Sequence, residues 1–229
     1  MKKTWAIVLA GGDGNRLRDL TMTRSGVAIP KQFCSLRGGA CLLQLALARA
    51  ARVAPAQRIC VVVAAQHQHW WSAPLDFLPR RNVAVQPANR GTAFGILLPL
   101  LDVLVRDPNA TVVLLPADHY SFDEATMPCS LKQAAELARA DAEALYILGA
   151  EPSEPDPELG YIVPADRNRD KPSRVVRFVE KPDLDRAYAL LNEGALRNVL
   201  FLPVWRAPYC VYTSSPSPLP SLQCARRFS

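Results

Sequence analysis

A glycine-rich turn near the start of the chain has the residue types that bind an anion. The apolar run Ala6–Ala10 is followed at once by a turn that contains Gly11, Gly12 and Gly14. Glycine lets the backbone adopt positive φ and approach a bound group closely. Successive N–H groups in such a turn can form an anion-binding concavity. Because Arg16 adds a positive charge just beyond the turn, the pattern favours a nucleoside triphosphate site.

Other interpretations of this turn have their own sequence requirements. A plain tight turn needs only the glycines, and this alternative stays open. A Walker A loop would close with Gly-Lys-Ser/Thr, which does not follow here. The spacing also differs from the G-x-G-x-x-G fingerprint, so a dinucleotide-dependent oxidoreductase is disfavoured.

Two further charged residues stand where such a ligand would need them. Lys31 follows Pro30 and supplies a second cation for a triphosphate. Asp118 follows the apolar run Thr111–Leu115, and open α/β sheets bind ligands beyond the carboxyl ends of their strands. A carboxylate there suits Mg²⁺, which takes one or two carboxylates together with substrate phosphates. Alternatively, Asp118 caps a turn.

The elements that position these residues have an alternating strand and helix pattern, which predicts an α/β fold. Strands are expected at Ala6–Ala10, Arg58–Ala64, Asn82–Val85, Thr111–Leu115, Leu145–Gly149, Arg174–Val179 and Val199–Leu202. Helices are expected at 41–53, 66–77, 94–105, 129–141 and 183–193. The last of these helices begins at Asp183 or Leu184, and Gly194 ends it.

The helix over 94–105 carries three specific expectations. Thr92 is a good N-cap residue for it. Its residues are apolar nearly all round, which predicts a central helix. Pro99 should kink it or mark a break.

A His-x-His pair, His67 and His69, lies beside Trp70 and Trp71. Such a pair can bind a metal ion, but no third ligand stands nearby in the sequence. A surface helix with packed aromatic residues is therefore favoured over a metal site.

The motifs around the turn resemble those of a known family. Leu9-Ala10-Gly11-Gly12-x-Gly14-x-Arg16-Leu17 resembles the opening of the sugar-1-phosphate nucleotidyltransferases. Pro30-Lys31-Gln32-Phe33 and Pro116-Ala117-Asp118-His119 look most like the mannose-1-phosphate guanylyltransferase branch. Asn15 stands where the family usually has Thr or Ser, and Asp19 where it usually has Pro.

The resemblance implies a fold and an activity. The fold is a Rossmann-like three-layer sandwich with a mixed, mostly parallel central sheet. The activity is nucleotidyl transfer from a nucleoside triphosphate, with GTP preferred, to a sugar 1-phosphate, with mannose 1-phosphate preferred. Mg²⁺ would be the cofactor, and Asp118 would bind it.

The resemblance also implies which residues act. The catalytic residues would be Arg16, Lys31 and Lys181. Nucleotide contacts would come from Leu9, Ala10, Gly11, Gly12, Gly14, Gln86, Asn89, Gly91 and Thr92. Sugar-phosphate contacts would come from Gly160, Tyr161, Glu180, Lys181 and Asn198.

The resemblance covers about residues 4 to 198. Family members continue with a segment that carries a second metal-binding Asp, and no match for it follows Asp185. We expect one nucleotidyltransferase domain over 1–202 and an irregular Pro/Ser-rich tail over 203–229. A non-catalytic nucleotide- or sugar-phosphate-binding protein, or a regulatory paralogue, is the alternative function.

Composition limits the partners. The 229 residues carry 27 Lys and Arg against 21 Asp and Glu, a net charge of +6, without the basic run of a nucleic-acid-binding arm. No apolar stretch reaches the roughly 18 residues of a membrane span. The six cysteines have no C-x-x-C spacing, so reduced thiols in a cytoplasmic protein are expected. Small-molecule substrates are the expected partners, and a homodimer stays open.

Overall fold

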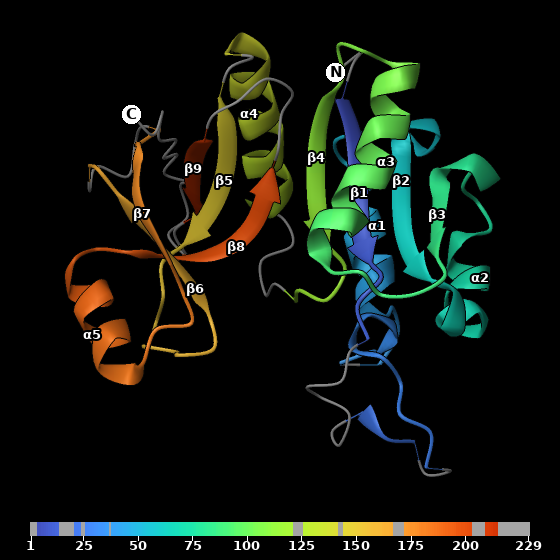
Figure 1. Ribbon diagram of the computed structural model, residues 1–229, viewed down its shortest axis with the longest axis horizontal. Helices are drawn as coiled ribbons and strands as arrows, with labels where there is room; N and C mark the ends of the chain where they lie inside the picture. The colour runs from blue at the N-terminus through green and yellow to red at the C-terminus, as the bar shows by residue number, and fades with distance from the viewer. Residues whose placement is uncertain are drawn as a thin grey trace. The chain divides into compact units, whose positions relative to one another are not determined.

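The computed structural model describes residues 4–13, 21–23, 26–36, 38–120, 126–141, 144–166, 172–202 and 209–214. The chain divides into two compact units, 1–122 and 123–229, where the sequence predicted one domain over 1–202 (Figure 1). Each unit is built on its own sheet, and the α/β fold class is confirmed.

The first unit contains a parallel sheet with the strand order β3-β2-β1-β4. Its strands are β1 (Thr4–Ala10), β2 (Ile59–Ala64), β3 (Val83–Gln86) and β4 (Thr111–Pro116). Its helices are α1 (Leu42–Ala51), α2 (Gln68–Leu75) and α3 (Thr92–Arg106), with short 3₁₀ turns at Lys31–Phe33, Ala56–Arg58, Ala65–His67 and Arg80–Asn82. Figure 1 shows α3 in front of this sheet and α1 behind it.

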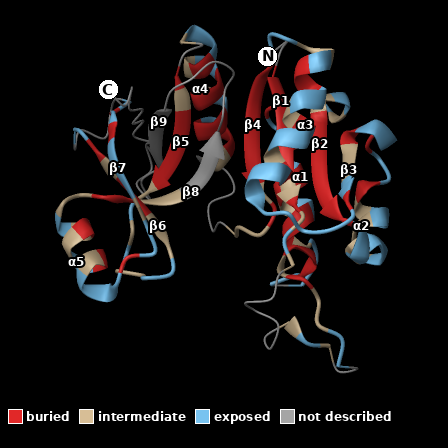
Figure 2. Ribbon diagram, in the orientation of Figure 1, coloured by how far each residue is buried: buried red, intermediate tan, exposed pale blue. Residues whose placement is uncertain are grey.

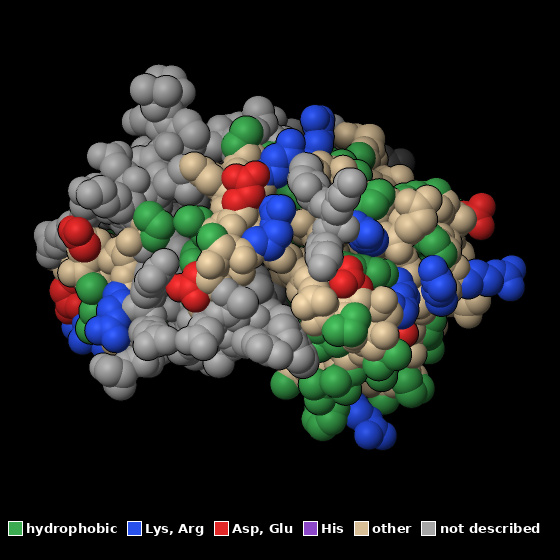
Figure 3. Space-filling view, turned by 90° about the horizontal axis from the view of Figure 1, so that it is seen from above, with side chains coloured by type: hydrophobic (Ala, Val, Ile, Leu, Met, Phe, Trp, Pro, Cys, Tyr) green, Lys and Arg blue, Asp and Glu red, His purple; other side chains and the backbone are tan. Residues whose placement is uncertain are grey.

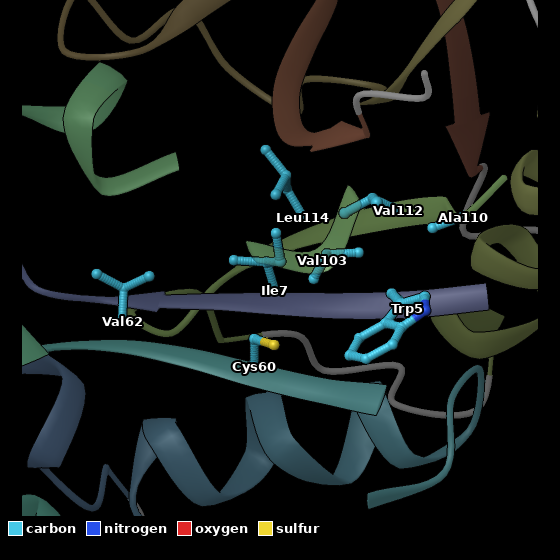
Figure 4. Close-up of a cluster of buried hydrophobic side chains, with 8 residues drawn as sticks. All are labelled: Trp5, Ile7, Cys60, Val62, Val103, Ala110, Val112 and Leu114. Carbon is cyan, nitrogen blue, oxygen red and sulfur yellow. The ribbon is translucent and has the colours of Figure 1, made fainter. Parts of the chain in front are cut away.

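The first unit has a core on both faces of its sheet: buried residues of α1, such as Leu43 and Ala46, cover one face, and a second cluster lies on the face toward α3. Every second residue of β1, β2 and β4 points to this face, so the alternation of the strands supplies one apolar layer. Figure 4 shows the resulting cluster, which contains Trp5, Ile7, Cys60, Val62, Val103, Ala110, Val112 and Leu114. Because β1, β2 and β4 are buried along nearly their whole length, their continuous apolar sequence is explained (Figure 2).

Helix α3 differs from its prediction at its N-cap and in its burial. Its N-cap is Gly91, at φ 84°, and Thr92 is the first helical residue, so the predicted cap at Thr92 is wrong. The helix runs unbroken through Pro99, which is buried, so of the two predicted outcomes the break does not occur. Burial of the proline ring offsets the hydrogen bond that a proline cannot donate.

The helix is also not central, because one face is open to solvent. The exposed fractions are 57% for Phe94, 57% for Leu98 and 84% for Val105, and Leu97 and Leu101 are exposed as well. Figure 3 shows hydrophobic side chains gathered on this side of the first unit. An apolar composition all round does not say which face packs, so this prediction fails.

The second unit contains a mixed sheet with the strand order β7-β6-β8-β5-β9. Its strands are β5 (Leu145–Ala150), β6 (Gly160–Pro164), β7 (Val175–Glu180), β8 (Leu196–Leu202) and β9 (Tyr209–Ser214). Its helices are α4 (Thr126–Ala140) and α5 (Leu184–Asn192). The cap prediction for α5 is confirmed, since Asp183 accepts a hydrogen bond from the Arg186 N–H and Gly194 follows the helix at φ 80°.

Strand β9 lies inside the tail that was expected to be irregular. It pairs in parallel with β5, from Leu145↔Tyr209 to Ala150↔Ser214. The segment Tyr209–Ser214 is rich in aromatic and β-branched residues, which favour strands, and the neighbouring prolines and serines hid this signal. Among the described residues, no helix is both long and apolar enough to cross a bilayer.

Candidate active site

The glycine turn after β1 is held by a buried glutamine from a separate segment. Gln32 is only 3% exposed, and its Nε2 donates to Ala10 O at 3.1 Å and to Gly12 O at 2.8 Å. Leu9 O accepts from Ala117 N at 3.0 Å, which ties the end of β1 to the end of β4. The predicted site residues Gly14 and Arg16 lie outside the described residues.

Gln86, the last residue of β3, packs against the glycine turn. A Cβ atom on Gly11 would lie 2.8 Å from Gln86 Oε1, and one on Gly95 would lie 3.7 Å from Gln86 Nε2. Gln86 is 8% exposed, so the two glycines leave room for its amide between turn and helix. The structure thus brings together Gly11 and Gln86, two predicted nucleotide contacts that are far apart in the sequence.

A second set of hydrogen bonds joins the turn to the loop before α3. Asp13 accepts from Asn89 Nδ2 at 3.0 Å and from Gln66 Nε2 at 3.0 Å. Asn89 Oδ1 in turn accepts from Gly91 N at 2.9 Å. The sequence prediction named Asn89 and Gly91 but missed Asp13 and Gln66. A polar residue shortly after each strand was the available signal.

Lys31 and Asp118, the predicted triphosphate cation and metal ligand, lie side by side. Lys31 Nζ donates to Asp118 Oδ2 at 3.4 Å, and the two side chains are 33% and 45% exposed. His119 Nε2 lies 3.8 Å from Asp118 Oδ1, and the carbonyl of His119 accepts from Arg49 Nη1 at 3.0 Å. Arg49 is 3% exposed, so a buried guanidinium fixes the segment that carries Asp118.

Asp118 has the donor type for Mg²⁺, but it does not belong to a multidentate cage. Within the described part of the chain, no group of three or more His, Cys, Asp or Glu side chains could hold a metal ion. A single accessible carboxylate fits Mg²⁺, which keeps several waters and takes phosphate oxygens as ligands.

The ring of His67 packs against another aromatic side chain, and the exposed His69 contacts the next residue along the chain. The His67 ring meets Phe33 edge-on at 5.9 Å between centroids, and His69 lies 4.5 Å from the Trp70 ring. Burial lowers the pKa of His67, and the nearby Asp13 carboxylate opposes this shift.

The predicted sugar-phosphate contacts lie in the second unit, and two of them, Glu180 and Asn198, approach Gly160. A Cβ atom on Gly160 would lie 2.6 Å from Glu180 Oε2, 3.2 Å from Phe178 Cζ and 3.7 Å from Asn198 Cβ. Asn198 Oδ1 is buried and has no hydrogen-bond partner within the described residues. Glu180, Gly160 and Asn198 therefore form one cluster, in which a side chain on residue 160 would have to displace the end of Glu180.

Lys181 has an unusual backbone beside this cluster. Its φ is +45°, the left-handed region that non-glycine residues rarely adopt, and its N–H donates to Leu159 O at 3.1 Å. Its Nζ lies 3.4 Å from Glu158 Oε2. This backbone conformation sets the direction in which the Lys181 side chain leaves the end of β7, toward Glu158.

Tyr161 is part of the core and does not face a pocket. It is fully buried against Ala187, Leu190 and Ala195. Its hydroxyl donates to Asp156 O at 3.0 Å and accepts from Asp156 N at 2.8 Å. These contacts indicate that Tyr161 anchors the 151–158 loop. They give no support to its predicted contact with the sugar.

Comparison with known proteins identifies a family. The family model described as nucleotidyl transferase matches residues 5–198. The chain is 32% identical over 196 residues to mannose-1-phosphate guanylyltransferase of Salmonella montevideo, and 33% identical over 196 residues to xanthan biosynthesis protein XanB of Xanthomonas campestris. These matches cover 82% and 85% of this chain, and the chain spans 40% of the length of each relative.

Solved structures have the same fold. A crystal structure described as mannose-1-phosphate geranyltransferase from Thermus thermophilus matches with a TM-score of 0.75 and 30% identity, over 87% of this chain and 56% of that chain. Inositol-1-phosphate CTP transferase from T. maritima matches with a TM-score of 0.55 and 19% identity, over 88% and 70%, which shows the fold alone.

Proposed function

Because this chain belongs to the nucleotidyl transferase family, we propose that it transfers the nucleotidyl group of a nucleoside triphosphate to a sugar 1-phosphate and releases pyrophosphate. GTP and mannose 1-phosphate are the proposed substrates. Their support is the similarity to mannose-1-phosphate guanylyltransferases and the form of the Pro30–Phe33 and Pro116–His119 segments.

The packing of Gln86 against Gly11 is the observation that carries this proposal. A plain tight turn does not need a glutamine amide packed this close. A Cβ atom on Gly11 would lie only 2.8 Å from Gln86 Oε1. A primary amide carries both donors and acceptors, so it can recognise the edge of a base. The N–H groups of the adjoining turn supply donors for phosphate oxygens.

The proposed reaction is an in-line displacement without a covalent enzyme intermediate. A phosphate oxygen of the sugar 1-phosphate attacks the α-phosphorus of the nucleotide. A new P–O bond forms as the bond to the pyrophosphate oxygen breaks, and pyrophosphate leaves with that electron pair. Lys31 and Arg16 would hold the triphosphate and neutralise its charge, so catalysis would come from positioning and electrostatics.

The sugar phosphate is proposed to bind at the Gly160 cluster. Lys181 would orient its phosphate, and Glu180 would accept hydrogen bonds from sugar hydroxyls. The unpartnered Oδ1 of Asn198 supports this assignment, because a buried acceptor without a donor is costly and a hydroxyl would satisfy it.

Mg²⁺ is the proposed cofactor, and Asp118 its proposed protein ligand. When bound there, it would neutralise charge on the phosphates. With one carboxylate as ligand, the metal should bind weakly without nucleotide. We therefore expect GTP affinity to depend on Mg²⁺, and Asp118→Asn to remove most of this dependence in calorimetric titrations. An unchanged dependence in Asp118→Asn would refute this assignment.

Pyrophosphate release tests the function directly. The full chain would be assayed with a panel of nucleoside triphosphates and hexose 1-phosphates, with Mg²⁺. We expect turnover above background, highest with GTP and mannose 1-phosphate, and strongly reduced in Lys31→Ala. Lys132→Ala, which removes an exposed lysine of α4, is the matched control. Nucleotide binding without turnover would instead indicate the non-catalytic alternative.

A further inference from the structure

We infer that Asp13 is a positioning residue that locks the glycine turn to the loop before α3 and so holds the nucleotide pocket in its binding shape. The inference rests on the proposed function for its effect on substrate. Asp13 is not assigned to touch the nucleotide.

The two carboxylate oxygens of Asp13 accept hydrogen bonds from two different loops. Oδ1 accepts from Gln66 Nε2 at 3.0 Å, and Oδ2 accepts from Asn89 Nδ2 at 3.0 Å. Asn89 extends this chain of hydrogen bonds, because its Oδ1 accepts from Gly91 N at 2.9 Å. Gly91 is the N-cap of α3, so the chain of bonds runs from the glycine turn to the first turn of that helix.

The topology explains why such a link is needed. Strand β2 lies between β1 and β3, and the register pairs Ala10 with Val63 and Ala64 with Gln86. The chain therefore leaves the three strands at nearly the same level of the sheet. Sheet hydrogen bonds end there, and the two nucleotide loops, after β1 and β3, are separated by the end of β2. Asp13 spans that gap.

The charge of Asp13 makes a merely local role hard to explain. The turn is proposed to bind a triphosphate, and a carboxylate within it repels phosphate charge. A small neutral residue would serve a tight turn without this repulsion. A carboxylate is explained if its two oxygens bind the neighbouring loops and hold each loop in one conformation. Loops that are already ordered lose less conformational freedom when a ligand binds.

An exchange of side chains tests the link. Asp13→Asn places an amide donor against the Asn89 donor, and Asn89→Asp places two carboxylates together. The combined variant, Asp13→Asn with Asn89→Asp, reverses donor and acceptor. It leaves an oxygen for Gln66 and another for the Gly91 N–H. Net charge is the same in the combined variant as in the original chain.

We expect each single variant to raise the Kd for GTP about tenfold, and the combined variant to return it to within about threefold of the original. The KM for the nucleotide should rise in the single variants while the KM for mannose 1-phosphate holds, and thermal melts should stay nearly unchanged. Equal loss in the combined and the single variants, or no loss in the single ones, would overturn the inference.

Amide hydrogen exchange of the same variants, without nucleotide, separates this inference from the proposed function. Asp13→Asn should speed exchange at residues 89–92, in the loop that it does not alter, and the combined variant should restore protection. If the original chain fails to bind any triphosphate, the proposed function fails, and the exchange result still decides whether Asp13 links the loops. Unchanged exchange at 89–92 would refute the link.

Discussion

At the amino ends of the parallel strands, the polar side chains are satisfied by one another and by nearby backbone, whereas at the carboxyl ends they tie the loops together and leave charged groups accessible. At the amino ends, Trp5 Nε1 donates to Asp107 Oδ2 at 3.2 Å, and the Arg106 guanidinium lies 4.4 Å from the Trp5 ring centroid. Arg106 also donates to Asn82 Oδ1 at 2.9 Å and to Asp102 Oδ2 at 2.7 Å. These groups satisfy one another without a ligand.

At the carboxyl ends, some polar side chains hold the loops in place, and others stay accessible to solvent. Gln32 and Asp13 use their side chains to hold loops, which shapes the turn after β1. Lys31 and Asp118 make one long contact of 3.4 Å and stay partly exposed. An exposed ion pair contributes little to stability. The comparison indicates that the amino ends stabilise the first unit, and it supports the proposal that the carboxyl ends bind a charged ligand.

The largest expected effect is on stability and comes from the amino ends. Trp5→Ala removes a side chain that is 5% exposed, together with its hydrogen bond and its contact with Arg106. We expect the free energy of unfolding to fall by about 3–5 kcal/mol in denaturant titrations. The milder Trp5→Phe should lose less and keep GTP affinity unchanged. A loss of affinity in folded Trp5→Phe would break the division between the two ends.

Lys31→Ala should show the opposite pattern. Loss of a charge-assisted contact to phosphate is expected to weaken GTP binding by about 1.5–3 kcal/mol, or one to two decades in Kd. The melting temperature should hardly change, because the pair with Asp118 is exposed. Calorimetry and a thermal melt, with Lys132→Ala as control, check both halves. A large stability loss with intact affinity would contradict the prediction.

Gly11→Ala tests the packing of Gln86 at the carboxyl ends by adding a single methyl group. The new methyl group would meet Gln86 Oε1 at 2.8 Å and push the flexible amide aside. We expect GTP affinity to fall about tenfold, or about 1.4 kcal/mol, with little loss of stability. Gly95→Ala is the matched control, since a Cβ atom there would lie at an ordinary contact distance of 3.7 Å from Gln86 Nε2 and would not displace the amide. Equal effects of the two variants on GTP affinity would show that the position of the Gln86 amide does not matter for binding.

The smallest expected effect is a pH dependence at His67. Because burial lowers its pKa, the neutral ring is favoured in the folded state, and the unfolded chain binds more protons below its pKa of 6.5. The stability contribution is therefore present above that value and is lost as the pH falls toward the folded pKa. Melts at about pH 7.5 and about pH 5.5 should show less destabilisation by acid in His67→Gln than in the original chain. His69→Gln serves as control, and equal acid sensitivity of His67→Gln and the original chain would contradict this.

Much of this arrangement could be predicted from local patterns, and the failures have physical causes. The strands β1, β2 and β4 were predictable because strands buried on both faces have continuous apolar sequences. The exposed face of α3 was not, since composition does not say what packs against a helix. Asp13 could not be assigned either, because its partners come from loops after two other strands.

The residues around Gly160 also show what a sequence motif can and cannot predict. Their motif predicted which residues matter, but not that Glu180 and Asn198 approach the missing Cβ of Gly160 from neighbouring strands. Tyr161 belongs to the same motif and is a core residue instead. The alternation of side chains along β6 decides this difference, because adjacent residues of a strand point to opposite faces.

The most direct test of the central claim is amide hydrogen exchange of the full chain with and without GTP and Mg²⁺. The claim predicts slower exchange on GTP binding at the carboxyl ends of the parallel strands, in residues 9–13 and 86–92. It predicts unchanged exchange at the amino ends, around Trp5, Asn82 and Asp107. Protection confined to the amino ends, or none at either end when GTP is saturating, would contradict it.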